Sequence, residues 1–327
     1  MSGADNRVKV GIIGGAGYTA GELLRLLINH PKVEIAWVNS RSNAGKRISE
    51  VHESLEGETD LKFSDGYSLD NIDVLFLCSA HGASREFWNE NPLPEHLKVV
   101  DLAQDYRDES NGYIYGLTDL NGSRVAAGRL VANPGCFATA IQLSLLPLAA
   151  AGLLPAEINI TALTGSTGAG VKPGATTHFS WRNDNVSVYK PFVHQHLAEI
   201  SRTLTRLQPS AADTRITFIP VRGDFARGIF AMTTLDCNLD EAEVRKLYEE
   251  FYRDSSFTRI SDRPINLKQV VNTNKALIGL NVNDGKLLVT AAIDNLLKGA
   301  SGQALENMNI LCGFDPTEGL KLKGSAF

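Results

Sequence analysis

Short apolar runs alternate with amphipathic stretches through the first 135 residues. β-Branched and aromatic residues cluster at residues 8–13, 33–38, 73–78, 97–102 and 130–132, at lengths typical of buried strands. Between the first two runs lies a helical pattern, ending at Asn29-His30-Pro31, whose apolar face comprises Leu23, Leu24, Leu27 and Ile28. Strands that alternate with helices predict an open, mostly parallel α/β sheet.

The second half of the chain has a different pattern. Strands are predicted at residues 158–163, 215–220, 228–233 and 287–292, as parts of one mixed or antiparallel sheet. Residues 240–251 predict an amphipathic helix with Asp240 as its N-cap, and a last helix passes through Met308 and Ile310. This half therefore predicts a second, α+β domain.

The first predicted strand runs directly into a glycine-rich turn that precedes a helix. Glycines in this context permit a tight turn and the close approach of a dinucleotide pyrophosphate to the helix N-terminus. An ordinary strand-to-helix turn is the alternative. The sequence predicts a Rossmann nucleotide-binding domain with cofactor contacts at Gly14, Gly15, Ala16, Gly17, Tyr18 and Thr19.

The end of the second strand bears on cofactor choice. NAD enzymes usually place a carboxylate there, on the ribose 2′-hydroxyl. This chain instead has Ser40-Arg41-Ser42, whose arginine and hydroxyls suit a 2′-phosphate. We therefore expect NADP(H), with a solvated loop and an incidental arginine as the alternative.

Other polar groups follow the strand ends, where open α/β sheets bind their ligands. His81-Gly82 is predicted to face the cofactor, and a structural histidine is the alternative. Arg107 either holds an anionic substrate group or pairs with Asp101 or Asp105. The small and hydroxyl residues at 164–170, among them Ser166 and Gly168, predict a loop able to donate to phosphate oxygens, and a flexible turn is the alternative.

A cysteine stands where a helix is predicted to begin. Asn133 suits the N-cap and Pro134 the first helical position, which places Cys136 in the first turn. Unpaired N–H groups and the helix dipole there favour the thiolate, which is the nucleophilic form. A buried cysteine acting as a small apolar residue is the alternative.

One close histidine pair, His194 and His196, precedes another helical pattern. On a helix His196 and Glu199 share a face, and a carboxylate beside an imidazole orients it for acid/base chemistry. A metal site needs a third ligand, which the sequence does not offer, so no metal is expected. A hydrogen-bonded structural histidine remains the alternative.

Composition narrows the class of protein. The formal net charge of −5 argues against non-specific nucleic-acid binding. No apolar run has the length of a membrane span, and residues 1–7 lack the core of a signal peptide. Four scattered cysteines without metal-type spacing suit a reducing cytoplasm.

Together these motifs resemble the N-acetyl-γ-glutamyl-phosphate reductase family, which is related to aspartate-semialdehyde and glyceraldehyde-3-phosphate dehydrogenases. The most specific segments are Asn133 to Thr139 and the Lys298-Gly-Ala-Ser-Gly-Gln303 run. The resemblance implies a Rossmann domain at 1–135 plus 298–327 and an α+β catalytic domain at 136–297. It also implies a homo-oligomer, a dimer or tetramer, that acts in arginine biosynthesis.

The resemblance assigns roles to residues. Cys136 would be the nucleophile that forms a thioester from an acyl phosphate, releasing inorganic phosphate before NADPH reduces the thioester to a semialdehyde. His196, with Glu199, would handle protons, although His194 is an alternative. Asn295 joins the expected cofactor contacts. The expected substrate contacts are Arg107, Asn133, His194, Arg222, Lys298 and Gln303, with a solvated Lys298 as the alternative.

One segment departs from the family pattern. Where the family has Pro-His-Leu and a further proline, this chain has Pro220-Val221-Arg222 and Asp224. An added arginine suggests an acidic acyl arm, such as N-succinyl rather than N-acetyl, and a salt bridge to Asp224 or a neighbouring residue is the alternative. Other readings of the whole chain are an aspartate-semialdehyde dehydrogenase, an N-acyl-aminoadipyl-phosphate reductase, or a non-catalytic NADP-binding redox sensor.

Overall fold

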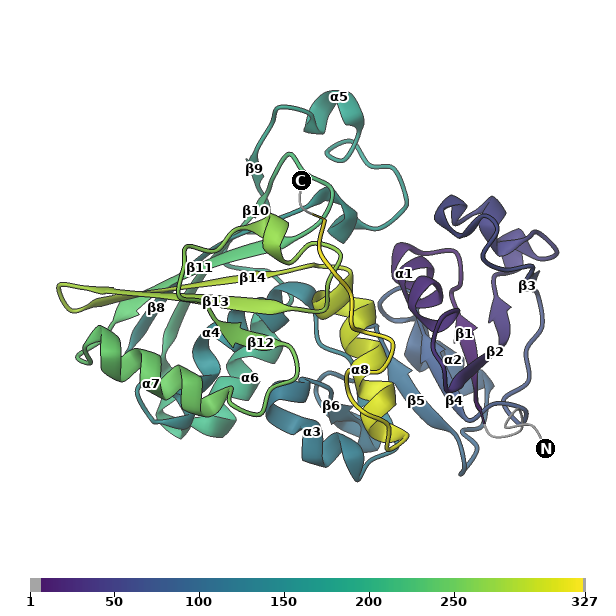
Figure 1. Ribbon diagram of the computed structural model, residues 1–327, viewed down its shortest axis with the longest axis horizontal. Helices are drawn as coiled ribbons and strands as arrows, with labels where there is room; N and C mark the ends of the chain where they lie inside the picture. Colours follow the sequence, from purple (N-terminus) through teal and green to yellow (C-terminus); the bar gives the residue numbers. More distant parts are fainter. Residues whose placement is uncertain (1–6, 326–327) are drawn as a thin grey trace. The chain divides into compact units, whose positions relative to one another are not determined.

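The computed structural model describes residues 7–325, which form two compact units (Figure 1). The first unit runs to Pro134 and resumes at Ala300–Lys321. The second comprises Gly135–Gly299 and residues 322–325. Each unit is built around its own seven-stranded sheet.

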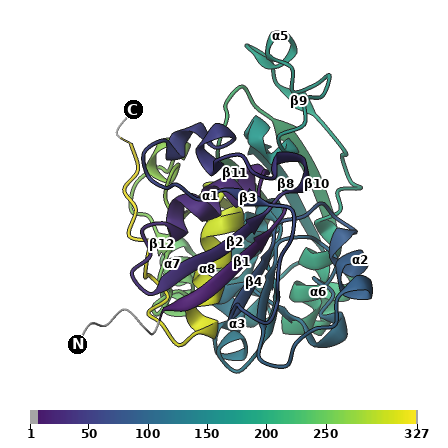
Figure 2. The same ribbon diagram turned by 90° about the vertical axis from the view of Figure 1, so that its right-hand side faces the viewer.

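The first unit is a parallel α/β sheet, as predicted. The strands lie in the order β3-β2-β1-β4-β5-β7-β6, and every neighbouring pair is parallel. Figure 2 shows β2, β1 and β4 side by side. The strands are β1 (Val8–Ile13), β2 (Val33–Asn39), β3 (Phe63–Ser64), β4 (Val74–Leu77), β5 (Lys98–Asp101), β6 (Ile114–Tyr115) and β7 (Leu130–Ala132).

The helices of the first unit bury the apolar faces that the sequence pattern shows. Leu23, Leu24 and Leu27 are buried on the first helix, and the last helix packs against α1, α3 and β5. This arrangement confirms the predicted Rossmann-type domain. The helices are α1 (Tyr18–Leu27), α2 (Ala83–Glu90), α3 (Thr118–Ala126) and α8 (Gly302–Leu311).

The second unit has the predicted mixed sheet, in the order β12-β13-β14-β11-β8-β10-β9. Strand β10 is parallel to β8 and β12 to β13, whereas the remaining neighbours are antiparallel. The strands are β8 (Glu157–Thr164), β9 (Ser187–Val188), β10 (Arg215–Arg222), β11 (Ile229–Asp236), β12 (Thr258–Ile260), β13 (Ala276–Asn283) and β14 (Lys286–Ile293).

Helices cover one face of this sheet (Figure 1). Helix α4 (Cys136–Ala150) packs on β11 and β14, and α7 (Glu241–Phe251) packs on β13. Helix α6 (Leu197–Leu207) lies against α4. The backbone N–H of Glu243 donates to the carboxylate of Asp240, which confirms Asp240 as the N-cap of α7.

A proline lies inside α4. Pro147 has no N–H to donate to the carbonyl of Leu143, four residues earlier. The hydroxyl of Tyr252, at the end of α7, donates to that carbonyl over 2.6 Å. A residue of another helix therefore supplies the hydrogen bond that the proline removes.

Short helical turns connect the larger elements, and one segment extends away from the second sheet. Helix α5 (Phe179–Arg182) belongs to that segment, which leads into β9 at the edge of the sheet (Figures 1 and 2). Exposed apolar side chains of this region include Val171, Phe179, Val186, Phe192 and Val193. The turns are η1 (Arg41–Asn43), η2 (Ile48–Glu50), η3 (Glu53–Leu55), η4 (Ser110–Gly112), η5 (Ser166–Ala169), η6 (Pro209–Asp213), η7 (Leu267–Gln269) and the π-helical η8 (Leu297–Ser301).

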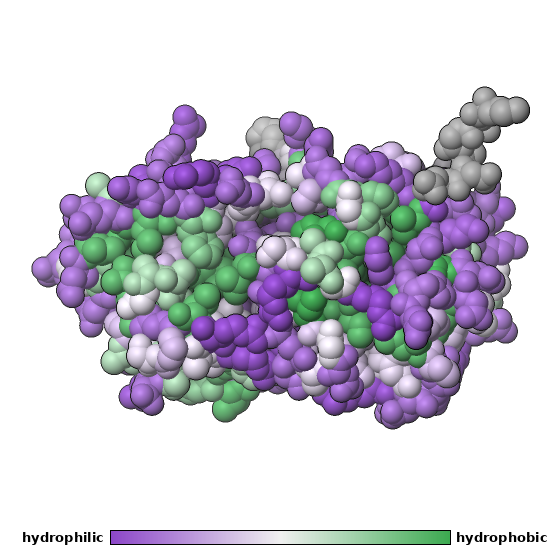
Figure 3. Space-filling view, turned by 90° about the horizontal axis from the view of Figure 1, so that it is seen from below, coloured by the Kyte–Doolittle hydropathy of each residue, from purple (hydrophilic) through white to green (hydrophobic). Residues whose placement is uncertain are grey.

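Hydrophobic residues also reach the surface elsewhere. On the face shown in Figure 3 they gather in separate groups with hydrophilic residues between them. Within residues 7–325, none of the helices combines the length and apolar character that crossing a membrane requires.

Candidate active site

Cys136 is the first residue of α4, so the prediction that it lies in the first turn is confirmed. Its thiol is partly exposed. The N-cap is Gly135, with extended backbone angles, so the predicted Asn133 cap and the placement of Pro134 at the first helical position are wrong. The reason is that the buried Asn133 amide donates to the carbonyl of Ala300 and accepts from Asn307.

An imidazole and a carboxylate lie against the residue before Cys136. The first turn of α6 places His196 Nε2 3.9 Å from Glu199 Oε1, which confirms that the two side chains share a face. The other carboxylate oxygen, Oε2, accepts the N–H of Gly135 over 3.1 Å. A β-carbon at position 135 would lie 2.4 Å from His196 Nε2, so only glycine permits this approach.

His194 differs from His196 in its surroundings. Its Nδ1 accepts the backbone N–H of His196 over 3.3 Å, and the two ring centroids are 4.6 Å apart. Burial, with a smaller effect of Lys190, lowers the pKa of His194 to about 4. His194 is therefore neutral at physiological pH, which favours His196 as the residue that exchanges protons.

Tyr189 and Arg222 form a second feature of the cysteine's surroundings. Burial raises the pKa of Tyr189, and the charge of Cys136 raises it further, as expected for neighbouring groups. The Arg222 guanidinium lies 4.5 Å from the Tyr189 ring centroid. Within residues 7–325 Arg222 has no ion pair with Asp224, whose carboxylate accepts the Asp184 N–H, and its buried Nε has no hydrogen-bond partner.

The Lys298-Gly299 turn also reaches Cys136. A β-carbon at Gly299 would lie 2.9 Å from that of Cys136, so the π-helical turn packs directly behind the cysteine. Lys298 is fully buried, with Nζ 5.7 Å from the Phe257 ring centroid, so the alternative of a solvated lysine is wrong. The sequence pattern does not predict that Gly299 contacts Cys136 or that Lys298 lies beside Phe257. The position of Gly299 inside the Lys298–Gln303 motif is the one signal that could have indicated a close contact.

The glycine turn of the first unit has the backbone that a pyrophosphate site needs. Gly14 has φ +79°, and a β-carbon there would lie 2.7 Å from the carbonyl oxygen of Cys78. Gly17 is the N-cap of α1, followed by Tyr18 and Thr19 in its first turn. The backbone therefore comes close to any ligand at this helix terminus without an intervening side chain.

The other predicted cofactor residues of this unit follow the ends of β2 and β4. Ser40 is buried and accepts from the Asn43 amide, whereas Arg41 and Ser42 are exposed. The Nδ1 of His81 accepts the Gln104 N–H. The N–H of Gly82 donates to the Asp105 carboxylate.

The remaining predicted ligands divide between the two units. In the second unit, the side chain of Asn295 bonds the Gly228 N–H and the Thr167 hydroxyl, beside the η5 turn that contains Ser166 and Gly168. In the first unit, buried Arg107 donates to the carbonyls of Asn133 and Leu102. Gln303 is buried in α8. Their roles toward ligands stay predictions.

Residues 7–325 contain no group of three or more histidine, cysteine, aspartate or glutamate side chains able to hold a metal ion. The site therefore consists of a helix-terminal thiol with an imidazole, a carboxylate, a phenol and a guanidinium nearby. These groups suit covalent acyl transfer with proton exchange.

Known proteins share this architecture. A family model described as the semialdehyde dehydrogenase NAD-binding domain matches residues 9–127, and one described as the semialdehyde dehydrogenase dimerisation domain matches residues 136–295. Aspartate semialdehyde dehydrogenase II from Vibrio cholerae superposes with a TM-score of 0.74 at 14% identity, covering 94% of this chain and 98% of that one. The fold is that of the semialdehyde dehydrogenase class.

Relatives at higher identity define the family. The N-acetyl-gamma-glutamyl-phosphate reductase of Parabacteroides distasonis is 58% identical over 322 residues, which is 98% of this chain and all of that protein. The reductase of the same name from Flavobacterium johnsoniae is 48% identical over 326 residues, again 98% and 100% of the two chains. The chain belongs to the N-acetyl-gamma-glutamyl-phosphate reductase family, which confirms the predicted resemblance.

Proposed function

We propose that this protein reduces an N-acyl-γ-glutamyl phosphate to the N-acyl-glutamate 5-semialdehyde and inorganic phosphate, as a step of arginine biosynthesis. The observation that carries the proposal is Cys136 at the start of α4, with the His196–Glu199 pair against Gly135. Full-length relatives with the reductase name support the substrate class. They do not favour the aspartate-semialdehyde, aminoadipyl or redox-sensor readings.

The chemistry follows from these groups. The Cys136 thiolate attacks the acyl carbon, the C–O bond to phosphate breaks, and a thioester remains. N–H groups at the start of α4 stabilise the negative oxygen that forms on the acyl carbon. After the hydride has added, His196, oriented by Glu199, protonates that oxygen to give the thiohemiacetal. It takes the proton back as the thiohemiacetal collapses to the semialdehyde and the Cys136 thiolate.

A nicotinamide cofactor supplies the hydride that reduces the thioester. A pyrophosphate fits the N-terminus of α1, because Gly14 permits the tight turn before it and Gly17, the N-cap, has no side chain to cover the unpaired N–H groups. We propose NADP(H) as the cofactor, because β2 ends at Asn39 and is followed by Ser40, without a carboxylate, and the exposed Arg41 can pair with a 2′-phosphate.

A steady-state assay in the oxidative direction tests this function. We expect N-acyl-glutamate semialdehyde, inorganic phosphate and NADP to give NADPH, and expect no NADPH when phosphate is omitted. Aspartate semialdehyde serves as the control substrate. Activity with aspartate semialdehyde but not with N-acyl-glutamate semialdehyde would contradict the proposal.

We also propose that the acyl arm of the substrate carries a carboxylate, as in an N-succinyl group. Arg222 lies at the end of β10 beside Tyr189, and its Nε has no partner among the described residues. The alternative salt bridge with Asp224 is absent from those residues. A guanidinium without an acidic partner suits a ligand carboxylate.

Arg222→Ala should raise KM for the N-succinyl substrate at least about tenfold, because a charge-assisted contact contributes roughly 1.5–3 kcal/mol. The N-acetyl substrate should be affected little. Steady-state kinetics with both substrates measures the difference. Preference of the unmutated enzyme for the N-acetyl compound, or equal loss with both, would refute the carboxylate arm.

Finally, we propose a dimer that packs through the face of the second sheet opposite α4. Register places Leu163, Phe230 and Leu277 in one row across that face, and all three are half-exposed. The family description of residues 136–295 as a dimerisation domain supports this surface. The absence of disulfides among the described residues supports the expected reducing cytoplasm.

A further inference from the structure

The carboxylate of Asp294 is a buried centre of hydrogen bonds in the second unit. It pairs with Arg227 through two contacts, Nε to Oδ2 at 3.0 Å and Nη2 to Oδ1 at 3.1 Å. The backbone N–H groups of Asn272, Leu296 and Leu297 also donate to it. A fully buried carboxylate needs this number of donors, because it has left water.

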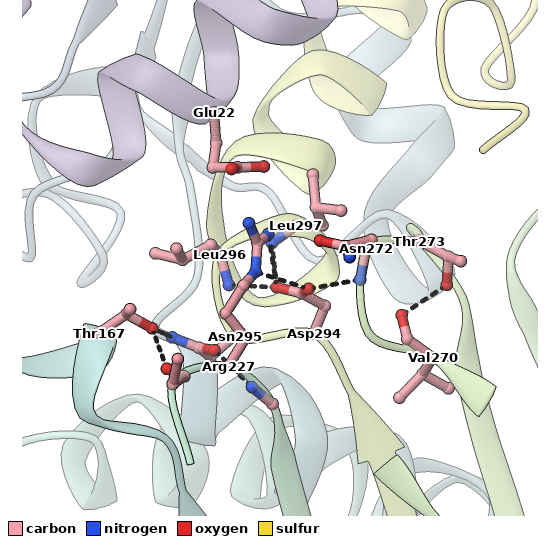
Figure 4. A network of polar contacts seen from close by, with 12 residues as sticks. Glu22, Thr167, Arg227, Val270, Asn272, Thr273, Asp294, Asn295, Leu296 and Leu297 are labelled. Atoms are coloured by element: carbon pink, nitrogen blue, oxygen red, sulfur yellow. Dashed lines mark hydrogen bonds and ion pairs between the residues drawn. The ribbon is translucent and has the colours of Figure 1, made fainter. Parts of the chain in front are cut away.

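These bonds join separate segments of the chain, as Figure 4 shows around Asp294. Arg227 comes from the loop between β10 and β11, Asn272 from the segment before β13, and Leu297 from the start of the π-helical turn. Next to them, Asn295 bonds the Gly228 N–H and the Thr167 hydroxyl. The loop after β8 is thereby held to the same centre.

The π-helical turn leads directly to the cysteine. The N–H of Gly299 donates to the backbone carbonyl of Asp294 over 2.9 Å. Gly299 in turn lies so close to Cys136 that an added β-carbon would be 2.9 Å from the cysteine's own. Movement of residues 294–299 would therefore change the position of the thiol or open space behind it.

We propose that Arg227 and Asp294 are positioning residues, which hold the Leu297–Ser301 turn so that Gly299 supports Cys136 in its reactive position. The proposal rests on Cys136 being the nucleophile of the proposed function. Neither residue belongs to the predicted set of substrate or cofactor contacts. Their effect on the reaction passes through backbone geometry, where a displacement of about 1 Å can lower a rate by roughly 10²-fold.

The test measures cysteine reactivity without any substrate. Full-length Arg227→Met, Arg227→Lys and Asp294→Asn are treated with iodoacetamide from pH 5.5 to 9, and mass spectrometry follows the peptide that contains Cys136. We expect about tenfold slower alkylation for Arg227→Met and Asp294→Asn, with partial recovery in Arg227→Lys. Arg245→Met is the matched control, since Arg245 forms a more exposed pair with Asp262, and it should alkylate normally.

Circular dichroism separates misfolding from misplacement. If Arg227→Met does not fold, Arg227→Lys and the isosteric Asp294→Asn decide the question. Unchanged or faster alkylation in the folded variants would overturn the positioning role. If the variants alkylate slowly but the unmutated protein uses no N-acyl-glutamate semialdehyde, the proposed function is contradicted and the positioning of Cys136 is still supported.

Discussion

The glycine turn of the first unit and the surroundings of Cys136 in the second are built in opposite ways. The turn is local, since residues 14–19 supply the positive φ, the N-cap and the first helical residues in sequence. The cysteine's neighbours come from Gly135, from the His196–Glu199 turn, and from Gly299, more than 160 positions further along. Local sites can be found from spacing, whereas assembled sites depend on the fold that brings their parts together.

Cys136→Ser should give the largest effect and test the assembled site at its centre. Serine is a far weaker nucleophile at neutral pH, so kcat should fall by at least about 10³-fold. NADPH affinity should stay within about twofold, because Cys136 is not among the predicted nucleotide contacts. Steady-state kinetics and fluorescence titration with NADPH measure the two quantities. Substantial residual turnover would exclude the covalent mechanism.

The buried carboxyl of Asp101 is a feature of the first unit that, unlike the glycine turn, depends on residues from other segments, and it should make stability depend on pH. Its buried carboxyl accepts from the Ser84 hydroxyl and the Ala103 N–H, and burial, partly offset by those bonds, raises its pKa from 3.8 to about 6. The folded state then binds more protons between these values, so the free energy of unfolding should fall as pH rises from about 4 to 6.

The size of this effect is on the order of 3 kcal/mol. Asp101→Asn should flatten the fall, which urea unfolding at pH 4 and pH 6.5 measures. Asp65→Asn, at an exposed position, is the control. Parallel pH curves for the Asp101 variant and the unmutated protein would show that this carboxyl does not couple folding to protons.

Glu199→Gln should lower kcat by about 10²-fold, since an unoriented imidazole loses much of the benefit of general acid/base catalysis. KM for NADPH should not change. Glu249→Gln is the control, because that carboxylate is exposed and pairs only at the surface with Arg245 among the contacts of the described chain. A normal kcat in the Glu199 variant would show that His196 does not need this carboxylate, which would contradict the assembled site.

Arg41→Ala should give the smallest effect and test the local site. Loss of a charge-assisted contact to the 2′-phosphate should reduce the preference for NADP over NAD by roughly tenfold. The ratio of kcat/KM values for the two cofactors measures it. Equal kinetics with NAD and NADP in the unmutated enzyme would remove the basis for this prediction.

Sequence reasoning predicted the larger elements of both sheets because their apolar runs are long and continuous. It missed β3, β6 and β9, which have two residues each, and β12, which has three, because such short strands show no pattern. It also missed β13, where Gly279, Asn281 and Asn283 alternate with apolar residues but are rare in strands. Gly279 is there because a β-carbon would lie 2.5 Å from the Thr290 hydroxyl of the neighbouring strand. Only the paired strand explains that glycine.

The candidate site shows the same division. The cysteine at a helix start and the His196–Glu199 face followed from short spacings. The wrong N-cap at Asn133 arose because that side chain bonds to residues 300 and 307, which no local rule anticipates. The Gly299 contact and the Arg227–Asp294 pair likewise depend on residues brought together by folding.

Pro147 and Tyr252 depend on each other physically although 105 positions separate them, so we expect them to change together in evolution. The proline leaves the Leu143 carbonyl without its helical donor, and the tyrosine hydroxyl replaces that donor. A lineage that loses the tyrosine while keeping the proline carries a buried, unbonded carbonyl, whereas loss of the proline frees the tyrosine to vary. Anyone who transplants α4 into a related scaffold must therefore carry the end of α7 with it.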